Sequence, residues 1–244
     1  MARLDGWVER NKEKSMVLVV QNDPEVPVGS YGEQLDDANV PWRLVRAYAG
    51  EPLPEPGELA AAIVLGGAMG VYDTAKYPFL STVREFMDVS VRADLPLLGI
   101  CLGGQLLADL CGAVVSSGQW GEKGVHGVTL TDAGGRDPLF TGIPREFLSF
   151  QWHNDSFALP AGSVLLASSL ACPNQAFRIG HHVYGLQFHP EVTSAIVAAW
   201  AGKTRATSSR WEEYVAEFTK HGPAYRPAAA RLLANFLSLA RKVC

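Results

Sequence analysis

Short apolar runs alternate with amphipathic segments through the first half of the chain. The apolar runs are continuous and rich in β-branched residues, as in strands that are buried on both faces. The segments between them carry apolar residues at helical spacing. The expected strands lie at 16–21, 42–48, 61–65 and 96–100, and the expected helices at 31–39, 78–93 and 104–110. Strands that alternate with helices predict right-handed crossovers and a parallel sheet of the α/β class.

The pattern changes in the second half of the chain, where shorter strand patterns are separated by turn residues. The expected strands lie at 113–115, 127–130, 147–152, 164–167, 175–179 and 183–188. Helical patterns follow at 194–202, 211–221 and 228–242. The second half therefore predicts an added antiparallel β segment and a C-terminal helical tail over 192–244.

Length and composition favour a single α/β domain over residues 16–244. The chain has 244 residues, of which 48% are hydrophobic and 19% charged, as in an ordinary globular protein. Residues 1–15 are rich in charge and have no apolar core, so we interpret them as an N-terminal extension and not as a secretory signal. No apolar run is long enough to cross a bilayer. The net charge of −4, without a basic cluster, argues against nucleic-acid and anionic-membrane partners.

The four cysteines form neither a C-x-x-C pair nor a dense framework. This usage is typical of a reducing compartment and predicts a cytoplasmic protein. It also argues against a structural zinc site, so we expect no metal ligands and no cofactor. We assign no chemistry to Cys111, Cys172 or Cys244.

The stretch around Cys101 carries the strongest chemical signal. A short apolar strand pattern leads into Gly99-Ile100-Cys101-Leu102-Gly103, and an apolar helix pattern follows at once. This is the nucleophile elbow G-x-Nuc-x-G with cysteine as the nucleophile. The glycines leave room for a sharp turn, and a helix N-terminus favours the reactive thiolate. The alternative is a tight turn around a buried thiol that has no catalytic role.

Two further features follow predicted strands, at the sheet edge where open parallel sheets bind ligands. His189 and Glu191 are two residues apart in an extended segment, so their side chains point the same way and Glu191 can orient His189. Gly66-Gly67 lets backbone N–H groups approach a ligand, although the pair alone could be a simple turn. We expect the amides of Gly67 and Leu102 to be oxyanion donors.

Two segments closely resemble the signatures of class I (triad) glutamine amidotransferases. They are Gly99-Ile100-Cys101-Leu102-Gly103-Gly104-Gln105 and Gly185-Leu186-Gln187-Phe188-His189-Pro190-Glu191, and their order and spacing match as well. The segments 65–73 and 151–155 look most like the stand-alone branch related to the amidotransferase domain of GMP synthase. The resemblance covers about residues 16–191, and the remaining tail resembles that branch only in being helical.

The resemblance implies a flavodoxin-like core and hydrolysis of the γ-amide of glutamine. Cys101 would attack the γ-amide and form a γ-glutamyl thioester, His189 would move the protons, and Glu191 would orient His189. Gln105 sits where the family helps to hold the amino-acid end of the substrate. Trp152 and His153 match the family segment that contacts this end through its backbone.

One position departs from the family pattern, because Asn154 stands where the family usually has glycine. Asparagine tolerates left-handed backbone geometry, so we expect the turn to survive. His153 with Asp155 suggests a second dyad, but we interpret this pair as structural and substrate-shaping. We interpret three further histidines as ordinary loop or turn residues: His126, His181 and His182.

These motifs leave three functions open. The first is a glutamine amidotransferase that passes ammonia to a separate synthetase, because the chain has no P-loop and no G-x-G-x-x-G after a strand. The second is a γ-glutamyl peptidase or hydrolase that uses the same triad with water as acceptor. The third is a non-catalytic binding protein, against which the retention of Cys101, His189 and Glu191 argues. We expect glutamine or another γ-glutamyl compound as substrate, and the motifs do not identify the leaving group.

Overall fold

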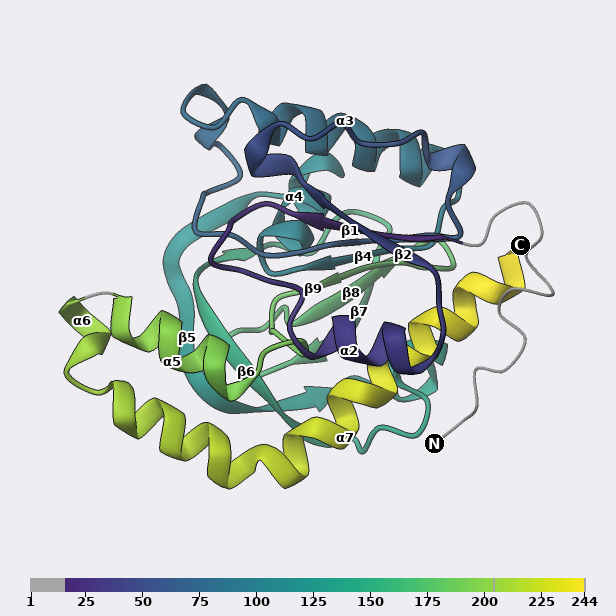
Figure 1. Cartoon of the computed structure of the whole chain (residues 1–244). Helices are drawn as coiled ribbons and strands as arrows, with labels where there is room; N and C mark the ends of the chain where they lie inside the picture. The colour runs from purple at the N-terminus through teal and green to yellow at the C-terminus, as the bar shows by residue number, and fades with distance from the viewer. Residues whose placement is uncertain (1–15, 204, 244) are drawn as a thin grey trace.

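The computed structural model describes residues 16–203 and 205–243. A nine-stranded sheet runs through this part of the chain in the order β2-β1-β3-β4-β9-β8-β7-β5-β6 (Figure 1). The predicted extension, 1–15, and Cys244 lie outside the described residues. The assignment of 16–244 to one domain stays a prediction.

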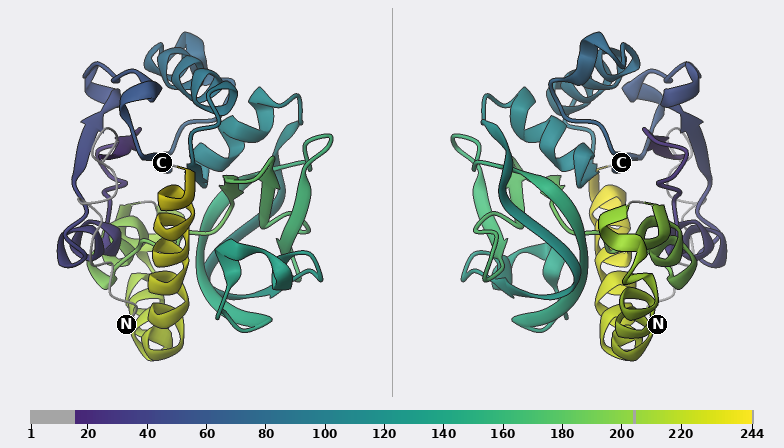
Figure 2. Two further views of the ribbon diagram at one scale, coloured as in Figure 1. Left: turned by 90° about the vertical axis from the view of Figure 1, so that its right-hand side faces the viewer. Right: turned by 90° about the vertical axis from the view of Figure 1, so that its left-hand side faces the viewer.

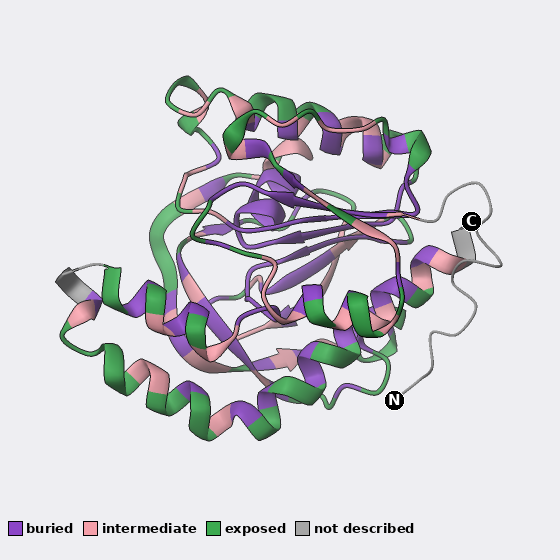
Figure 3. Ribbon diagram, viewed as in Figure 1, coloured by how far each residue is buried: buried purple, intermediate pink, exposed green. Residues whose placement is uncertain are grey.

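One half of the sheet is parallel, which confirms the predicted α/β core. Its strands are β1 (Val17–Gln21), β2 (Trp42–Arg46), β3 (Ala61–Val64), β4 (Leu97–Ile100) and β9 (Val183–Leu186). Side chains alternate across the sheet, so Val19 packs into one core while Leu18 and Val20 pack into the other. Figure 3 shows the inner strands buried between helical layers, which explains their continuous apolar sequences.

Helices cover both faces of the sheet (Figure 1). The helices of one face are α3 (Phe79–Arg92) and α4 (Leu102–Leu110), and those of the other are α2 (Ser30–Asp37), α5 (Ser194–Lys203) and α7 (Trp211–Val243). A short α6 (Arg205–Ser208) links α5 to α7, and five short 3-10 turns complete the helical elements: η1 (Ala47–Ala49), η2 (Pro56–Glu58), η3 (Asp73–Ala75), η4 (Gly134–Arg136) and η5 (Pro138–Phe140). None of the helices in the described ranges is long and apolar enough to cross a membrane.

The antiparallel segment continues the same sheet. Its strands are β5 (Val115–Leu130), β6 (Glu146–Phe157), β7 (Val164–Ser168) and β8 (Ala176–Ile179), and the long β5 and β6 curve strongly (Figure 2). The prediction of two short strands at 113–115 and 127–130 was wrong. The polar, glycine-rich stretch between them joins β5 because its backbone pairs with β6, with a register shift between Ser117 and Glu122.

The helical tail also differs from its prediction in detail. Separate helices at 211–221 and 228–242 were expected. Proline inside a helix removes a hydrogen bond and clashes with the preceding turn, at about 3 kcal/mol or more. The structure instead has the single helix α7, which contains Pro223 and Pro227 and bends along its length (Figure 1). Burial of a large apolar side chain stabilises by roughly 1.5–3 kcal/mol. The packed side chains that offset the two prolines are Phe218, Tyr225, Leu232, Leu233, Phe236 and Leu237.

Removal of one such side chain should destabilise the whole domain. Phe236→Ala is expected to cost about 3–5 kcal/mol, because its fully buried ring leaves a cavity between α7 and the sheet. Leu170→Ala is the control, because Leu170 is fully exposed and should change stability by less than about 0.5 kcal/mol. Urea unfolding of both variants measures the difference, and equal midpoints would show that α7 is not part of the cooperative core.

Candidate active site

Cys101 lies at the sharp turn between β4 and α4. Its backbone takes φ 51° and ψ −108°, a strained conformation for a residue with a side chain. The turn is held by the Cys101 N–H, which donates to the carbonyl of Leu186 on β9 at 2.8 Å. The thiol therefore sits at the N-terminus of α4 and at the carboxyl end of β4, as the elbow pattern predicts.

Two glycines let α4 begin this close to the sheet. A Cβ on Gly103 would lie 2.1 Å from the carbonyl oxygen of Val64 on β3. A Cβ on Gly104 would lie 2.6 Å from the carbonyl oxygen of Leu186 on β9. Both neighbours are sheet backbone, which cannot move aside without breaking strand pairing. The glycines after Cys101 are therefore required by close packing.

His189 and Glu191 form a buried pair beside the turn. The His189 Nδ1 lies 2.7 Å from Oε1 of Glu191, and both side chains are almost fully buried. Because a carboxylate only accepts hydrogen bonds, Nδ1 of His189 carries a proton and donates a hydrogen bond to Glu191. The other ring nitrogen, Nε2, is then the one that can exchange a proton with a substrate. A Cβ placed on Gly66 would lie 3.0 Å from Cε1 of His189 and 3.4 Å from Cβ of Cys101. The His189 ring and Cys101 therefore both lie next to Gly66.

The charge state of His189 follows from its neighbours. Burial alone would lower the pKa of His189, but the Glu191 carboxylate and the Cys101 side chain outweigh it and raise this pKa to about 10. The imidazole is therefore protonated at neutral pH and stands ready to donate a proton.

The loop after β3 lines the same cavity as Cys101. Its shape is held by Asn22, which donates to the carbonyl of Leu65 at 2.7 Å, and by Asp23, which accepts from the Ala68 N–H at 3.0 Å. Gly67 lines the same cavity as Cys101. The N–H of Leu102 opens α4 and has no acceptor within that helix.

The predicted residues converge on one cavity of about 510 Å³. Among those that line it are Gly67, Cys101, Gln105, Trp152, His153 and His189. Glu191 stands behind His189, and Leu102 contributes its backbone beside Cys101 while its side chain is fully buried. Residues from the β4–α4 turn, α4, β6 and the segment after β9 therefore meet at one cavity.

The predicted substrate residues have different surroundings. Gln105 is buried and donates to the carbonyl of Asp155 at 3.0 Å, which leaves its side chain fixed at the cavity wall. The Trp152 ring stacks on Phe150 with centroids 5.8 Å apart. Asn154 lies exposed in β6 and is not among the described residues with positive φ, so a left-handed turn is not needed there.

Three residues beside the candidate triad carried no role in the sequence analysis. Gln187 is buried, and its side-chain amide contacts the Cys101 sulfur at 3.7 Å. Tyr225 of α7 donates to the backbone carbonyl of His189 at 2.9 Å, and the edge of Trp200 meets the His189 ring at 4.9 Å between centroids. Gln187 could have been found from the sequence, because it is a polar residue directly after an apolar strand. Tyr225 and Trp200 lie on helices elsewhere in the chain, and no sequence pattern links them to His189.

The fold and the turn at Cys101 are those of a flavodoxin-like protein with a nucleophile elbow. A family model described as glutamine amidotransferase class-I matches residues 38–197. The chain belongs to the class I glutamine amidotransferase family.

Relatives and a solved structure agree with this assignment. The chain is 34% identical over 169 residues to a glutamine amidotransferase-like protein, YfeJ, of Salmonella typhimurium, with 68% of this chain and 71% of that protein covered. It is 39% identical over 161 residues to one subunit of the glutamine-hydrolysing GMP synthase of Thermococcus kodakarensis, with 62% and 81% covered. A match to the GMP synthase of Thermosipho melanesiensis is 32% identical over 212 residues and covers 80% of this chain but 39% of that protein. The crystal structure of a glutamine amidotransferase from Thermotoga maritima superposes with a TM-score of 0.82 at 28% identity, covering 91% of this chain and 97% of that one.

The close approach at Gly103 leads to a prediction about stability. Gly103→Ala should destabilise the protein by about 1–3 kcal/mol or more, because the new methyl group meets the Val64 carbonyl. Gly57→Ala is the control, since a Cβ at Gly57 meets nothing within 4 Å. Thermal unfolding compares the two, and an unchanged midpoint for Gly103→Ala would show that α4 can move away from the sheet.

Proposed function

We propose that this protein hydrolyses the γ-amide of glutamine through a thioester on Cys101 and supplies the ammonia to a separate acceptor enzyme. The observation that carries the proposal is the meeting of a strained cysteine and a buried His–Glu pair at one cavity, which Gly67 also lines. Membership of the class I family supports glutamine as the substrate class.

The first half of the reaction needs three groups. The Cys101 thiolate attacks the γ-carbonyl carbon, and the resulting oxyanion accepts hydrogen bonds from the Gly67 and Leu102 amides. Collapse of this intermediate breaks the C–N bond, and the proton of His189 Nε2 goes to the departing nitrogen, which leaves as ammonia. The acyl group remains on sulfur as the γ-glutamyl thioester.

The second half restores the enzyme. His189, now neutral, takes a proton from water as the water oxygen attacks the thioester carbonyl. The C–S bond breaks, glutamate leaves, and Cys101 and His189 return to a thiolate and an imidazolium. Glu191 holds the imidazole by its Nδ1–H and stabilises its charge throughout.

The walls of the cavity would hold the amino-acid end of the substrate. Gln105, Trp152 and His153 are the residues that we assign to this role, and all three line the cavity together with Cys101. Gln187 would keep the Cys101 sulfur in place through its side-chain amide.

The acceptor would be another protein, because the Thermococcus kodakarensis relative is itself one subunit of a GMP synthase. The open cavity would face that partner, so that ammonia passes to it directly. The cytoplasm stays the predicted location.

A γ-glutamyl peptidase or hydrolase is the second candidate, and the size of the cavity favours it. Pockets for drug-sized ligands measure about 300–1,000 Å³. The cavity of about 510 Å³ falls within this range, so it can accept a γ-glutamyl compound larger than glutamine. Water is then the acceptor and no synthetase is needed.

A release assay separates the two candidates. Ammonia release from glutamine, alone and with candidate synthetase partners, is compared with cleavage of γ-glutamyl peptides. The amidotransferase proposal predicts that glutamine is the better substrate and that a synthetase raises its turnover. Fast peptide cleavage with negligible glutamine turnover would contradict it and support the hydrolase.

Replacement of the nucleophile tests the thioester. Cys101→Ala should lower turnover by about 10⁴-fold or more and abolish labelling by a glutamine-like electrophile. Cys111→Ala, which removes a half-buried thiol just after α4, should keep both activities. Labelling that persists in Cys101→Ala would identify a different nucleophile.

The pH profile tests the His–Glu pair. In the wild type, kcat/KM should fall at high pH as His189 loses its proton near its pKa of about 10. In Glu191→Gln the imidazolium loses its carboxylate partner, so the pKa of His189 falls and this alkaline limb should move down by about 1–3 pH units. An unmoved limb would mean that another group controls it.

A further inference from the structure

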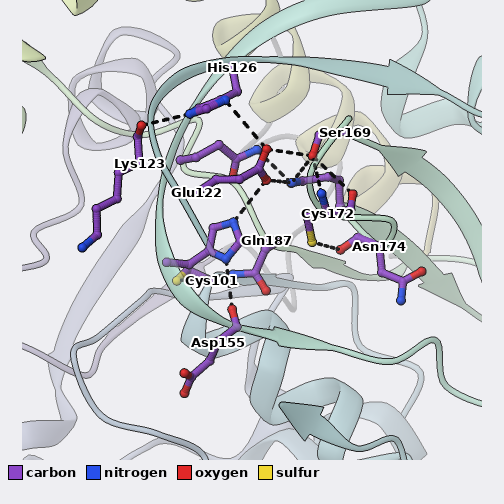
Figure 4. Close-up of polar contacts among 12 residues, drawn as sticks. Cys101, Glu122, Lys123, His126, Asp155, Ser169, Cys172, Asn174 and Gln187 are labelled. Carbon is purple, nitrogen blue, oxygen red and sulfur yellow. Dashed lines mark hydrogen bonds and ion pairs between the residues drawn. The ribbon is translucent and has the colours of Figure 1, made fainter. Parts of the chain in front are cut away.

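A second cluster of polar side chains is buried behind the His153 wall of the cavity. It consists of Glu122, His126, His153, Ser169, Cys172 and Gln175, and we call it the Glu122 cluster. Glu122 and His153 are directly opposite each other on the antiparallel strands β5 and β6, and Cys172 comes from the connection between β7 and β8. Figure 4 shows Glu122 in the centre, with His126, Ser169 and Cys172 around it.

Glu122 is 5% exposed, and both oxygens of its carboxylate accept hydrogen bonds from neutral donors. Ser169 Oγ donates to Oε1 at 2.8 Å, and Gln175 Nε2 donates to Oε2 at 2.5 Å. Among the ion pairs of the described residues, Glu122 has only histidine partners and no lysine or arginine. A buried carboxylate without a cation is unfavourable, so a bound cation would stabilise the cluster.

Both histidines turn their second ring nitrogen toward this carboxylate. His153 Nδ1 lies 3.0 Å from the carbonyl oxygen of Asp155, and His126 Nε2 lies 2.9 Å from that of Lys123. A carbonyl only accepts, so these two nitrogens donate. The nitrogens that face Glu122 are Nε2 of His153, 3.4 Å from Oε2, and Nδ1 of His126, 3.8 Å from Oε1.

This arrangement is typical of histidines that bind a metal ion, whose other ring nitrogen donates to a backbone carbonyl or carboxylate. The buried His153 Nε2 has no hydrogen-bond partner among the described residues, although Glu122 is near. It is thus a ligand atom aimed into the cluster and left unused by the hydrogen bonds of the protein.

Cys172 supplies a third ligand atom. Its Sγ, the His153 Nε2 and a Glu122 carboxylate oxygen all lie within 4.8 Å of one another. Around a tetrahedral zinc ion, bonds of roughly 2.0–2.3 Å separate such ligand atoms by about 3.3–3.8 Å. The 3.4 Å between His153 and Glu122 already falls in this range, so a small inward shift of Cys172 completes three sides of a zinc site.

We propose that Glu122, His153 and Cys172 bind one zinc-type divalent cation. The mixed nitrogen, sulfur and oxygen donors suit zinc better than magnesium or calcium. The ion replaces the Cys172 proton, so each binding event forms a metal–sulfur bond and releases one proton to solvent.

The ion has a structural role in this proposal. It ties β5, β6 and the β7–β8 connection together and fixes His153, which forms part of the cavity wall. No step of the reaction passes through it, so the proposal stands or falls independently of the proposed function.

Metal content of the tag-free full chain tests the proposal. After incubation with zinc at micromolar concentration and gel filtration, the wild type should retain about one zinc per chain by elemental analysis. Cobalt in place of zinc should give the intense near-ultraviolet absorption of a thiolate–cobalt bond. Zinc should also raise the unfolding temperature.

Matched variants assign the ligands. Cys172→Ser should lose the thiolate band, and Glu122→Gln should weaken zinc binding by at least about tenfold. Cys111→Ser and Cys101→Ser should keep the band and the full zinc content, because neither thiol belongs to the cluster.

Two results would overturn the proposal, and both come from proteins that remain folded. The first is a wild type that retains less than a tenth of an equivalent of zinc and shows no thiolate–cobalt band. The second is retention that is unchanged in Cys172→Ser, which would mean binding elsewhere.

Discussion

The close approach of α4 to the sheet is the constraint on which the site depends. The first turn of α4 lies so near the backbones of β3 and β9 that Gly103 and Gly104 leave no room for a Cβ. This approach forces Cys101 into its strained turn and directs the N-terminus of α4 into the cavity. A looser junction would relax the turn and separate the thiol from the amides beside it. The position of the Cys101 thiol therefore depends on tight backbone packing between α4 and the sheet.

The candidate triad also depends on parts of the chain outside the parallel core. The His189 N–H donates to the carbonyl of Phe150 on β6, and the His189 carbonyl accepts from Tyr225 on α7. The antiparallel half and the helical tail thereby hold the backbone of the histidine from opposite sides. Burial of His189 and Glu191 together strengthens their attraction, because little water screens it. The tail thus acts as part of the site's framework as well as of the core.

The parallel core was predictable because its signals are local. An inner strand buried on both faces must be apolar throughout, and β1, β3 and β4 are. The predictions at β5 and α7 were wrong for the opposite reason. Glycines and polar residues in β5, and prolines in α7, disfavour those elements locally, and pairing with β6 or packing against the sheet outweighs that preference. Such long-range contacts produce no periodic pattern of apolar residues within the segment itself, so its sequence does not predict them.

The sequence by itself determined the chemical types at the site and their order. Gly-x-Cys-x-Gly requires a tight turn, and a histidine two residues before a glutamate in extended chain can pair with it. Only the tertiary structure decided what surrounds them: Gln187 at the sulfur, Tyr225 behind His189, and Glu122, His153 and Cys172 in one buried cluster. These groups come from strands, loops and helices far apart in the chain. Their proximity arises from sheet order and strand register, which depend on the packing of the whole domain.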